Sequence, residues 1–79
     1  MSESRIAQRQ VTHKSAAIYY GAGVMECVVR NLSETGACIE VVEPWRLPSD
    51  FTLIVKPEYK RRPCRVVWRS PDRLGVSFV

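Results

Sequence analysis

The chain has 79 residues, of which 46% are hydrophobic and 25% are charged. This composition is that of one small globular domain, and it argues against a disordered chain. The formal net charge of +4 at pH 7 favours an anionic partner. Because no stretch resembles a signal peptide or is long and apolar enough to span a bilayer, we expect a cytoplasmic protein without membrane insertion.

The charge is unevenly distributed along the chain. Basic residues exceed acidic ones in residues 1–14 and again in residues 56–79, whereas acidic residues predominate in residues 15–55. This pattern suggests an anionic partner that contacts both basic ends. The alternative is that the charges only cover the exterior of a small domain, and for the Lys60-Arg61-Arg62 segment we favour that alternative.

Residues 1–14 lack apolar periodicity and are predicted to form a flexible N-terminal arm. Arg5 and Arg9 lie four residues apart, which places them on the same side of either a helix or an extended strand. A guanidinium group can bind a phosphate or the O6 and N7 edge of guanine with two hydrogen bonds, and it can stack on a base. Considered alone, two solvated arginines in a disordered terminus are the simpler explanation.

From residue 15 onward the pattern is that of short β-strands. Apolar residues alternate with polar ones, and Gly, Pro, Asn, Asp or Ser separate the runs. No stretch shows the 3.6-residue apolar period of an amphipathic helix. The predicted strands are the segments 16–20, 24–32, 36–42, 51–55, 64–69 and 74–78.

Short antiparallel strands would leave exposed edges in an open sheet, and closure into a barrel removes those edges. We therefore predict an all-β fold, in which residues 15–79 form a six-stranded antiparallel β-barrel behind the flexible arm of residues 1–14. An apolar opening of this barrel would need a cover, and a second copy of the chain could provide it. A homodimer is therefore a hypothesis.

A second polar cluster lies between the second and third predicted strands. Asn31 and Ser33 end one strand, and Gly36 begins the next, where glycine allows a positive φ or a close backbone approach. The Asn31 amide and the Ser33 hydroxyl share one face of a continuing strand and could bind a guanine edge or, for the hydroxyl, a phosphate. The alternative is a polar turn in which both side chains bond to their own backbone.

Together, the two clusters resemble the Arg-x-x-x-Arg and Asp/Asn-x-Ser-x-x-Gly signature of PilZ domains, which are bacterial β-barrels that in many cases bind cyclic di-GMP. Arg5 and Arg9 match the two arginines, and Asn31, Ser33 and Gly36 match the second motif. Segments 28–37, 65–69 and 74–78 also look like strands of that family. The resemblance covers roughly residues 5–79, nearly the whole chain.

The resemblance implies a PilZ-like split barrel that acts as a cyclic di-GMP receptor or adaptor in bacterial second-messenger signalling. In that family the arm folds over the barrel, its arginines clasp the nucleotide, and the turn reads a guanine. The same is implied here, with the ligand ordering the arm and altering a surface for an unknown effector protein. The predicted ligand-binding residues are Arg5, Arg9, Asn31, Ser33, Gly36 and Trp68.

Two features depart from the family pattern and predict weaker binding. Position 31 is Asn where Asp is a common alternative, and Gln8 and Gln10 flank Arg9 where relatives often carry further arginines. Trp68 falls where some relatives place an aromatic or aliphatic residue near the bound base. A tryptophan in the barrel core explains Trp68 at least equally well.

We predict neither an enzyme nor a metal protein. The chain shows no nucleophile–base pair, catalytic carboxylate pair or phosphate-binding loop. Cys27, Cys38 and Cys64 lack the close spacing of zinc ligands and are expected to fill the core, and no cofactor is expected besides the nucleotide ligand.

Two other functions stay open. One is a PilZ-like protein-interaction module that does not bind nucleotide. The other is a small RNA- or single-strand-binding barrel that uses the basic segment from Lys56 to Arg73, although nucleic acid is the less favoured partner.

Overall fold

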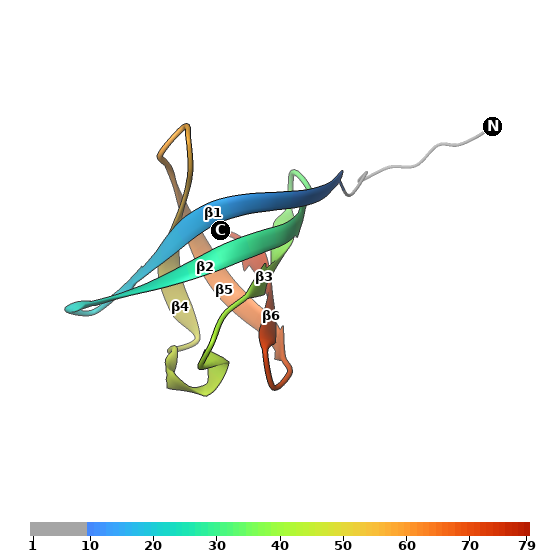
Figure 1. Cartoon of the computed structure of the whole chain (residues 1–79). Coiled ribbons are helices and arrows are strands. Elements are labelled where there is room, and N and C mark those ends of the chain that lie inside the picture. Colours follow the sequence, from blue (N-terminus) through green and yellow to red (C-terminus); the bar gives the residue numbers. More distant parts are fainter. Residues whose placement is uncertain (1–9) are drawn as a thin grey trace.

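The computed structural model describes residues 10–79, which form a closed barrel of six antiparallel strands (Figure 1). The order around the barrel is β1-β2-β3-β6-β5-β4, and β4 pairs with β1 to close it. The predicted all-β barrel is confirmed. The elements are β1 (Gln10–Tyr20), β2 (Gly23–Leu32), β3 (Gly36–Glu40), the 3₁₀ helix η1 (Pro44–Arg46), β4 (Asp50–Val55), β5 (Lys60–Arg69) and β6 (Arg73–Phe78).

The barrel core consists of the apolar residues that alternate along each strand. Burying one such side chain contributes about 1.5–3 kcal/mol, and among the described residues no polar or charged residue is buried. Nor does this part of the chain contain a helix that could span a membrane. The residues with no exposed surface are Ile18, Val29, Ile39, Leu53 and Leu74, and β5 contributes Cys64, which is 1% exposed.

β1 begins earlier than the sequence predicts. Gln10 pairs with Leu32 and Val11 with Asn31, so residues 10–14 belong to the barrel and not to the arm. The alternation is lost here because the register shifts between Val11 and Lys14, as in a β-bulge. β4 pairs only with the later part of β1, from Ala16 onward. Residues 10–14 therefore have no paired β4 residues beside them, and their sequence shows no apolar face.

β5 also begins earlier than predicted. The Lys60-Arg61-Arg62 segment, which lies outside the predicted strand 64–69, pairs in register with residues 53–55 of β4. Strands pair through backbone hydrogen bonds, which do not depend on the side chains. A charged segment can therefore form a strand, provided that its side chains reach solvent or a barrel opening. The turn is confined to residues 56–59.

Candidate functional site

A cavity of about 230 Å³ lies on the surface between the β2–β3 turn and the β5–β6 pair. Ser33 and Gly36 line it from the turn, and Trp68 lines it from β5. Three of the residues that the sequence predicts as ligand-binding therefore meet in one place, although Trp68 is far from the other two in sequence. Gly75 of β6 and Cys38 of β3 also line this cavity.

The Ser33 side chain organises the turn. Its hydroxyl oxygen accepts hydrogen bonds from the backbone N–H groups of Thr35 and Gly36, both at 3.2 Å, and the Ser33 N–H donates to the Gly36 carbonyl at 2.9 Å. In such a turn, a side-chain hydroxyl takes the place of a backbone carbonyl as the acceptor for backbone N–H groups. Ser33 therefore bonds to its own turn, which is one of the two roles the sequence allows.

Gly36 permits a close approach between β3 and β6. It pairs with Ser77, and a Cβ atom at position 36 would collide with the carbonyl oxygen of Val76. Positive φ is not the reason for glycine here, because Gly21 is the only glycine of the described residues with that conformation. Of the two roles that the sequence suggests for Gly36, close approach is the one observed.

A β-bulge in β5 turns Trp68 to the outer face. Val66 pairs with Val76 and Trp68 pairs with Gly75, so Val67 is an extra residue with no partner on β6. An extra residue moves the following side chain to the opposite face of the sheet. Trp68 is consequently 46% exposed, and its interpretation as a core tryptophan is wrong.

Gly75 provides the surface on which the Trp68 indole lies. A Cβ atom at Gly75 would collide with the indole nitrogen and the neighbouring ring carbons of Trp68. The ring therefore lies directly over the Gly75 backbone. Gly75 is not among the predicted site residues, although a glycine inside a strand pattern is a known signal of close backbone approach.

Asn31 lies in the same row of cross-strand pairs as Trp68, but it does not line the cavity. Asn31 pairs with Cys38, Cys38 with Gly75, and Gly75 with Trp68. Directly opposed residues point to the same face of a sheet, and the neighbours of Cys38, Ala37 and Ile39, belong to the core. The row therefore faces outward, and its ends, three strand spacings apart, are at most about 14 Å from each other.

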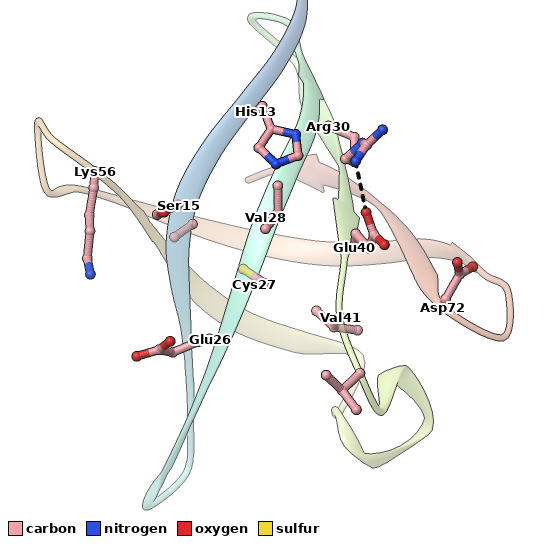
Figure 2. A pocket seen from close by; sticks show the side chains of 12 residues that line it. His13, Ser15, Glu26, Cys27, Val28, Arg30, Glu40, Val41, Lys56 and Asp72 are labelled. Carbon is pink, nitrogen blue, oxygen red and sulfur yellow. Dashed lines mark hydrogen bonds and ion pairs between the residues drawn. The ribbon is translucent and has the colours of Figure 1, made fainter.

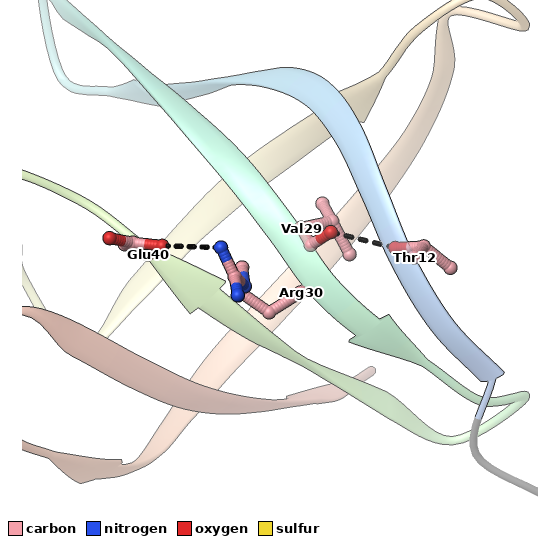
Figure 3. A network of polar contacts seen from close by, with 4 residues as sticks. All are labelled: Thr12, Val29, Arg30 and Glu40. Carbon is pink, nitrogen blue, oxygen red and sulfur yellow. Dashed lines mark hydrogen bonds and ion pairs between the residues drawn. The ribbon is translucent and has the colours of Figure 1, made fainter.

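A polar network holds the strand next to Asn31 (Figure 3). Arg30 is the extra residue where the β2–β3 register shifts, and its Nη1 donates to Oε1 of Glu40 at 3.2 Å. On the neighbouring strand the Thr12 hydroxyl donates to the Val29 carbonyl at 2.7 Å. Both side chains of the ion pair are partly exposed, so it contributes at most about 1 kcal/mol. It joins the extra residue of β2 to the last residue of β3.

The three cysteines are free and buried, but they lie in two different environments. Burial raises the pKa of Cys27 to about 12 and that of Cys64 to about 11, and both belong to the core as the sequence predicts. Cys38 instead lies in the outward row and lines the cavity beside Gly75. Within residues 10–79 there is no group of His, Cys, Asp or Glu that could hold a metal ion.

A larger and more open groove of about 660 Å³ follows β2 on another side of the barrel. Figure 2 shows that its side chains come from β1, β2, the end of β3 and the turns before β5 and β6. Acidic Glu26, Glu40 and Asp72 and basic Arg30 and Lys56 all line it. This mixture of charges does not select an anion, and of the predicted ligand residues that the structure describes, none lines this groove.

The predicted arginines Arg5 and Arg9 lie outside the described residues. The family model described as PilZ domain matches residues 3–79, a range that includes both arginines and the turn from Asn31 to Gly36. No curated protein matches the chain.

Proposed function

The chain belongs to the PilZ domain family, a family of cyclic di-GMP-binding modules, and we propose that it is a cyclic di-GMP receptor that acts as an adaptor and not as an enzyme. The observation that carries this proposal is the convergence of Ser33, Gly36 and Trp68 on one surface cavity. Two of these residues belong to the motif of the family. The third offers an aromatic surface to a base.

The size of the cavity favours a single guanine base as its occupant. At about 230 Å³ it is smaller than the roughly 300–1,000 Å³ pockets that enclose drug-sized ligands. The half-exposed indole of Trp68 is available for stacking, which contributes about 1–3 kcal/mol per base in proteins that bind single strands. The phosphates and the second guanine would then extend across the outer face of the barrel.

Asn31 is suited to contact the part of the nucleotide that leaves the cavity. It lies in the outward row that ends at Trp68, at a spacing that a dinucleotide can span and one base cannot. Its carboxamide both donates and accepts, as a guanine edge requires. In this proposal Ser33 contributes chiefly by shaping the turn, because its hydroxyl already accepts two backbone N–H groups.

Arg5 and Arg9 complete the proposed site. Arg5 and Arg9 precede Gln10 in sequence, and Gln10 pairs with Leu32 beside Asn31, at the same end of the barrel as the turn. Their guanidinium groups would bind the phosphates or stack on a guanine. We infer that the nucleotide draws this segment onto the barrel, and that the resulting surface is the one an effector protein recognises.

Isothermal titration of cyclic di-GMP into the purified chain, with GTP and cyclic di-AMP as controls, tests the proposal. We expect saturable binding that is selective for cyclic di-GMP. Absence of heat at tens of micromolar nucleotide would reject the receptor function and favour a protein-interaction module that does not bind nucleotide. Displacement of cyclic di-GMP by excess single-stranded RNA would instead favour the RNA-binding alternative.

The two tryptophans offer a matched pair of variants for locating the site. Trp45 in η1 is 66% exposed but does not line the cavity, whereas Trp68 does. We expect Trp68→Ala to weaken cyclic di-GMP binding about tenfold, as the loss of one stacking contact would, and Trp45→Ala to leave it unchanged. Equal effects of both variants on binding would show that the nucleotide binds outside this cavity.

A further inference from the structure

One end of the barrel is open, and cations surround its apolar floor. The cavity at this end has a volume of about 170 Å³. Leu32, Val55 and Phe78 form its apolar part, and all three pack with the core at the ends of β2, β4 and β6. The charged residues that line it are Lys14, Lys60, Arg62 and Glu58.

The cations that line this opening are Lys14, Lys60 and Arg62. Within residues 10–79, no carboxylate lies in ion-pair contact with Lys14, Lys60 or Arg62. The Arg62 guanidinium lies 4.7 Å from the centroid of the Phe78 ring, so it covers part of the apolar floor. Among the described residues of the lining, Glu58 is the single acidic one, so they carry an excess of positive charge.

This opening differs from the proposed nucleotide site in both direction and size. Leu32 points into the barrel, whereas its neighbours in sequence, Asn31 and Ser33, belong to the outer row and the turn. The volume of the opening is too small for a nucleotide. An apolar cavity of about 150 Å³ in another protein, however, accommodates benzene. The space therefore suits an apolar group of one ring.

We propose that this end of the barrel binds a small anion whose apolar part is about the size of one ring. The ring would contact Leu32, Val55 and Phe78, and the anionic group, a carboxylate or a phosphate, would accept hydrogen bonds from Lys60 and Arg62. A forked guanidinium beside an ammonium group is a good partner for either anion. The proposal goes beyond cyclic di-GMP binding and does not depend on it.

An NMR titration of the full chain tests the proposal, with benzoate and phenyl phosphate as probes. Benzyl alcohol and inorganic phosphate are the controls that carry only the ring or only the anion. We expect saturable shifts of the Leu32 and Val55 methyl groups with both probes and with neither control. The tighter of the two probes identifies the preferred anionic group.

Neighbouring residues of β5 provide matched variants. Arg62 lines the cavity, whereas Arg61 is exposed and does not line it. We expect Arg62→Gln or Lys60→Gln to weaken probe binding about tenfold, as loss of a charged hydrogen-bond partner would, and Arg61→Gln to change it less than twofold. The methyl shifts of the unsubstituted chain test the location even if a variant is unstable.

Four results would overturn the proposal. They are the absence of saturable shifts at about 10 mM probe, shifts centred on the outer cavity beside Trp68, equal binding of either control, and equal weakening by Arg61→Gln and Arg62→Gln. None of them measures cyclic di-GMP binding, which the titration with nucleotide tests separately.

Discussion

The indole of Trp68 lies directly over the backbone of Gly75, and even a methyl group at Gly75 would collide with the ring. The two residues are opposite each other on β5 and β6, immediately after the bulge at Val67. The bulge turns the tryptophan outward, and the glycine leaves the space that the ring occupies. A candidate surface for base stacking thus depends on a residue that need not contact the ligand.

We expect Gly75→Ala to displace the Trp68 indole and to weaken cyclic di-GMP binding about tenfold, comparable to the loss of one base–aromatic contact. Titration calorimetry measures the affinity. Fluorescence of Trp68 in a Trp45→Phe background reports the displacement, because the chain has only these two tryptophans.

A double-mutant cycle provides the control for this prediction. In a Trp68→Ala background the added methyl group of Gly75→Ala no longer meets the indole, so the second substitution should have little further effect on binding. If the two effects were additive, Gly75 would act on the nucleotide by another route than through Trp68.

We expect Gly36→Ala to lower the free energy of unfolding by about 1–3 kcal/mol, the usual cost of inserting a group into a packed site. The added Cβ would meet the Val76 carbonyl, which is backbone and cannot rotate away as a side chain can. Urea denaturation measures the change. Glu34→Ala, an exposed substitution in the same turn, should change stability by less than about 0.5 kcal/mol.

We expect Asn31→Asp to increase the affinity for cyclic di-GMP several-fold, because a carboxylate accepts from guanine N1–H and N2–H₂ with charge assistance. Titration calorimetry at two salt concentrations measures this effect. A decrease in affinity that high salt relieves would show that residue 31 faces a phosphate, since like charges repel and salt screens them.

We expect Arg9→Ala to abolish detectable cyclic di-GMP binding while the barrel stays folded. Arg9→Lys should restore only part of the affinity, because an ammonium group keeps the charge but lacks the planar fork of donors. Calorimetry measures binding, and circular dichroism checks the fold. Unchanged affinity in Arg9→Ala would show that the N-terminal segment is not part of the nucleotide site.

The stability of the barrel should decrease at alkaline pH because of the buried Cys27 thiol. Burial raises the pKa of Cys27 from 9.0 to about 12, so between these values the unfolded chain releases a proton that the folded chain retains. Below pH 9 the thiol is neutral in both states, and its preference for the folded state is fully present. As the pH rises above 9, the contribution falls by about 1.4 kcal/mol per pH unit.

Urea denaturation of the unsubstituted chain and of Cys27→Ala at pH 8 and about pH 10 isolates this contribution. The substitution costs packing energy at both pH values, and Cys64 titrates in both proteins, so these effects cancel in the comparison. The stability difference between the two proteins should shrink at the higher pH. A constant difference would mean that the thiol of Cys27 reaches solvent in the folded state.

The buried face of a strand could be predicted from the sequence where apolar and polar residues alternate without a bulge. Phe51, Leu53 and Val55 alternate along β4, and all three are buried on one face as expected. The role of Ser33 could be predicted for a similar reason, since its hydroxyl bonds to residues close in sequence, whereas the need for glycine at position 36 comes from Val76 on β6. Local patterns are informative where the partner is either the core or the next few residues.

The sequence by itself determined that this protein is a small all-β barrel with a polar turn at Asn31–Gly36, because alternation decides which face of each strand is buried. Only the tertiary structure decided that Trp68 points outward onto Gly75 and that Lys60 and Arg62 surround an open end of the barrel. The physical reason is that a bulge or an extension of a strand is stabilised by hydrogen bonds to a neighbouring strand. Those partners follow from how the barrel closes, which no short stretch of sequence specifies.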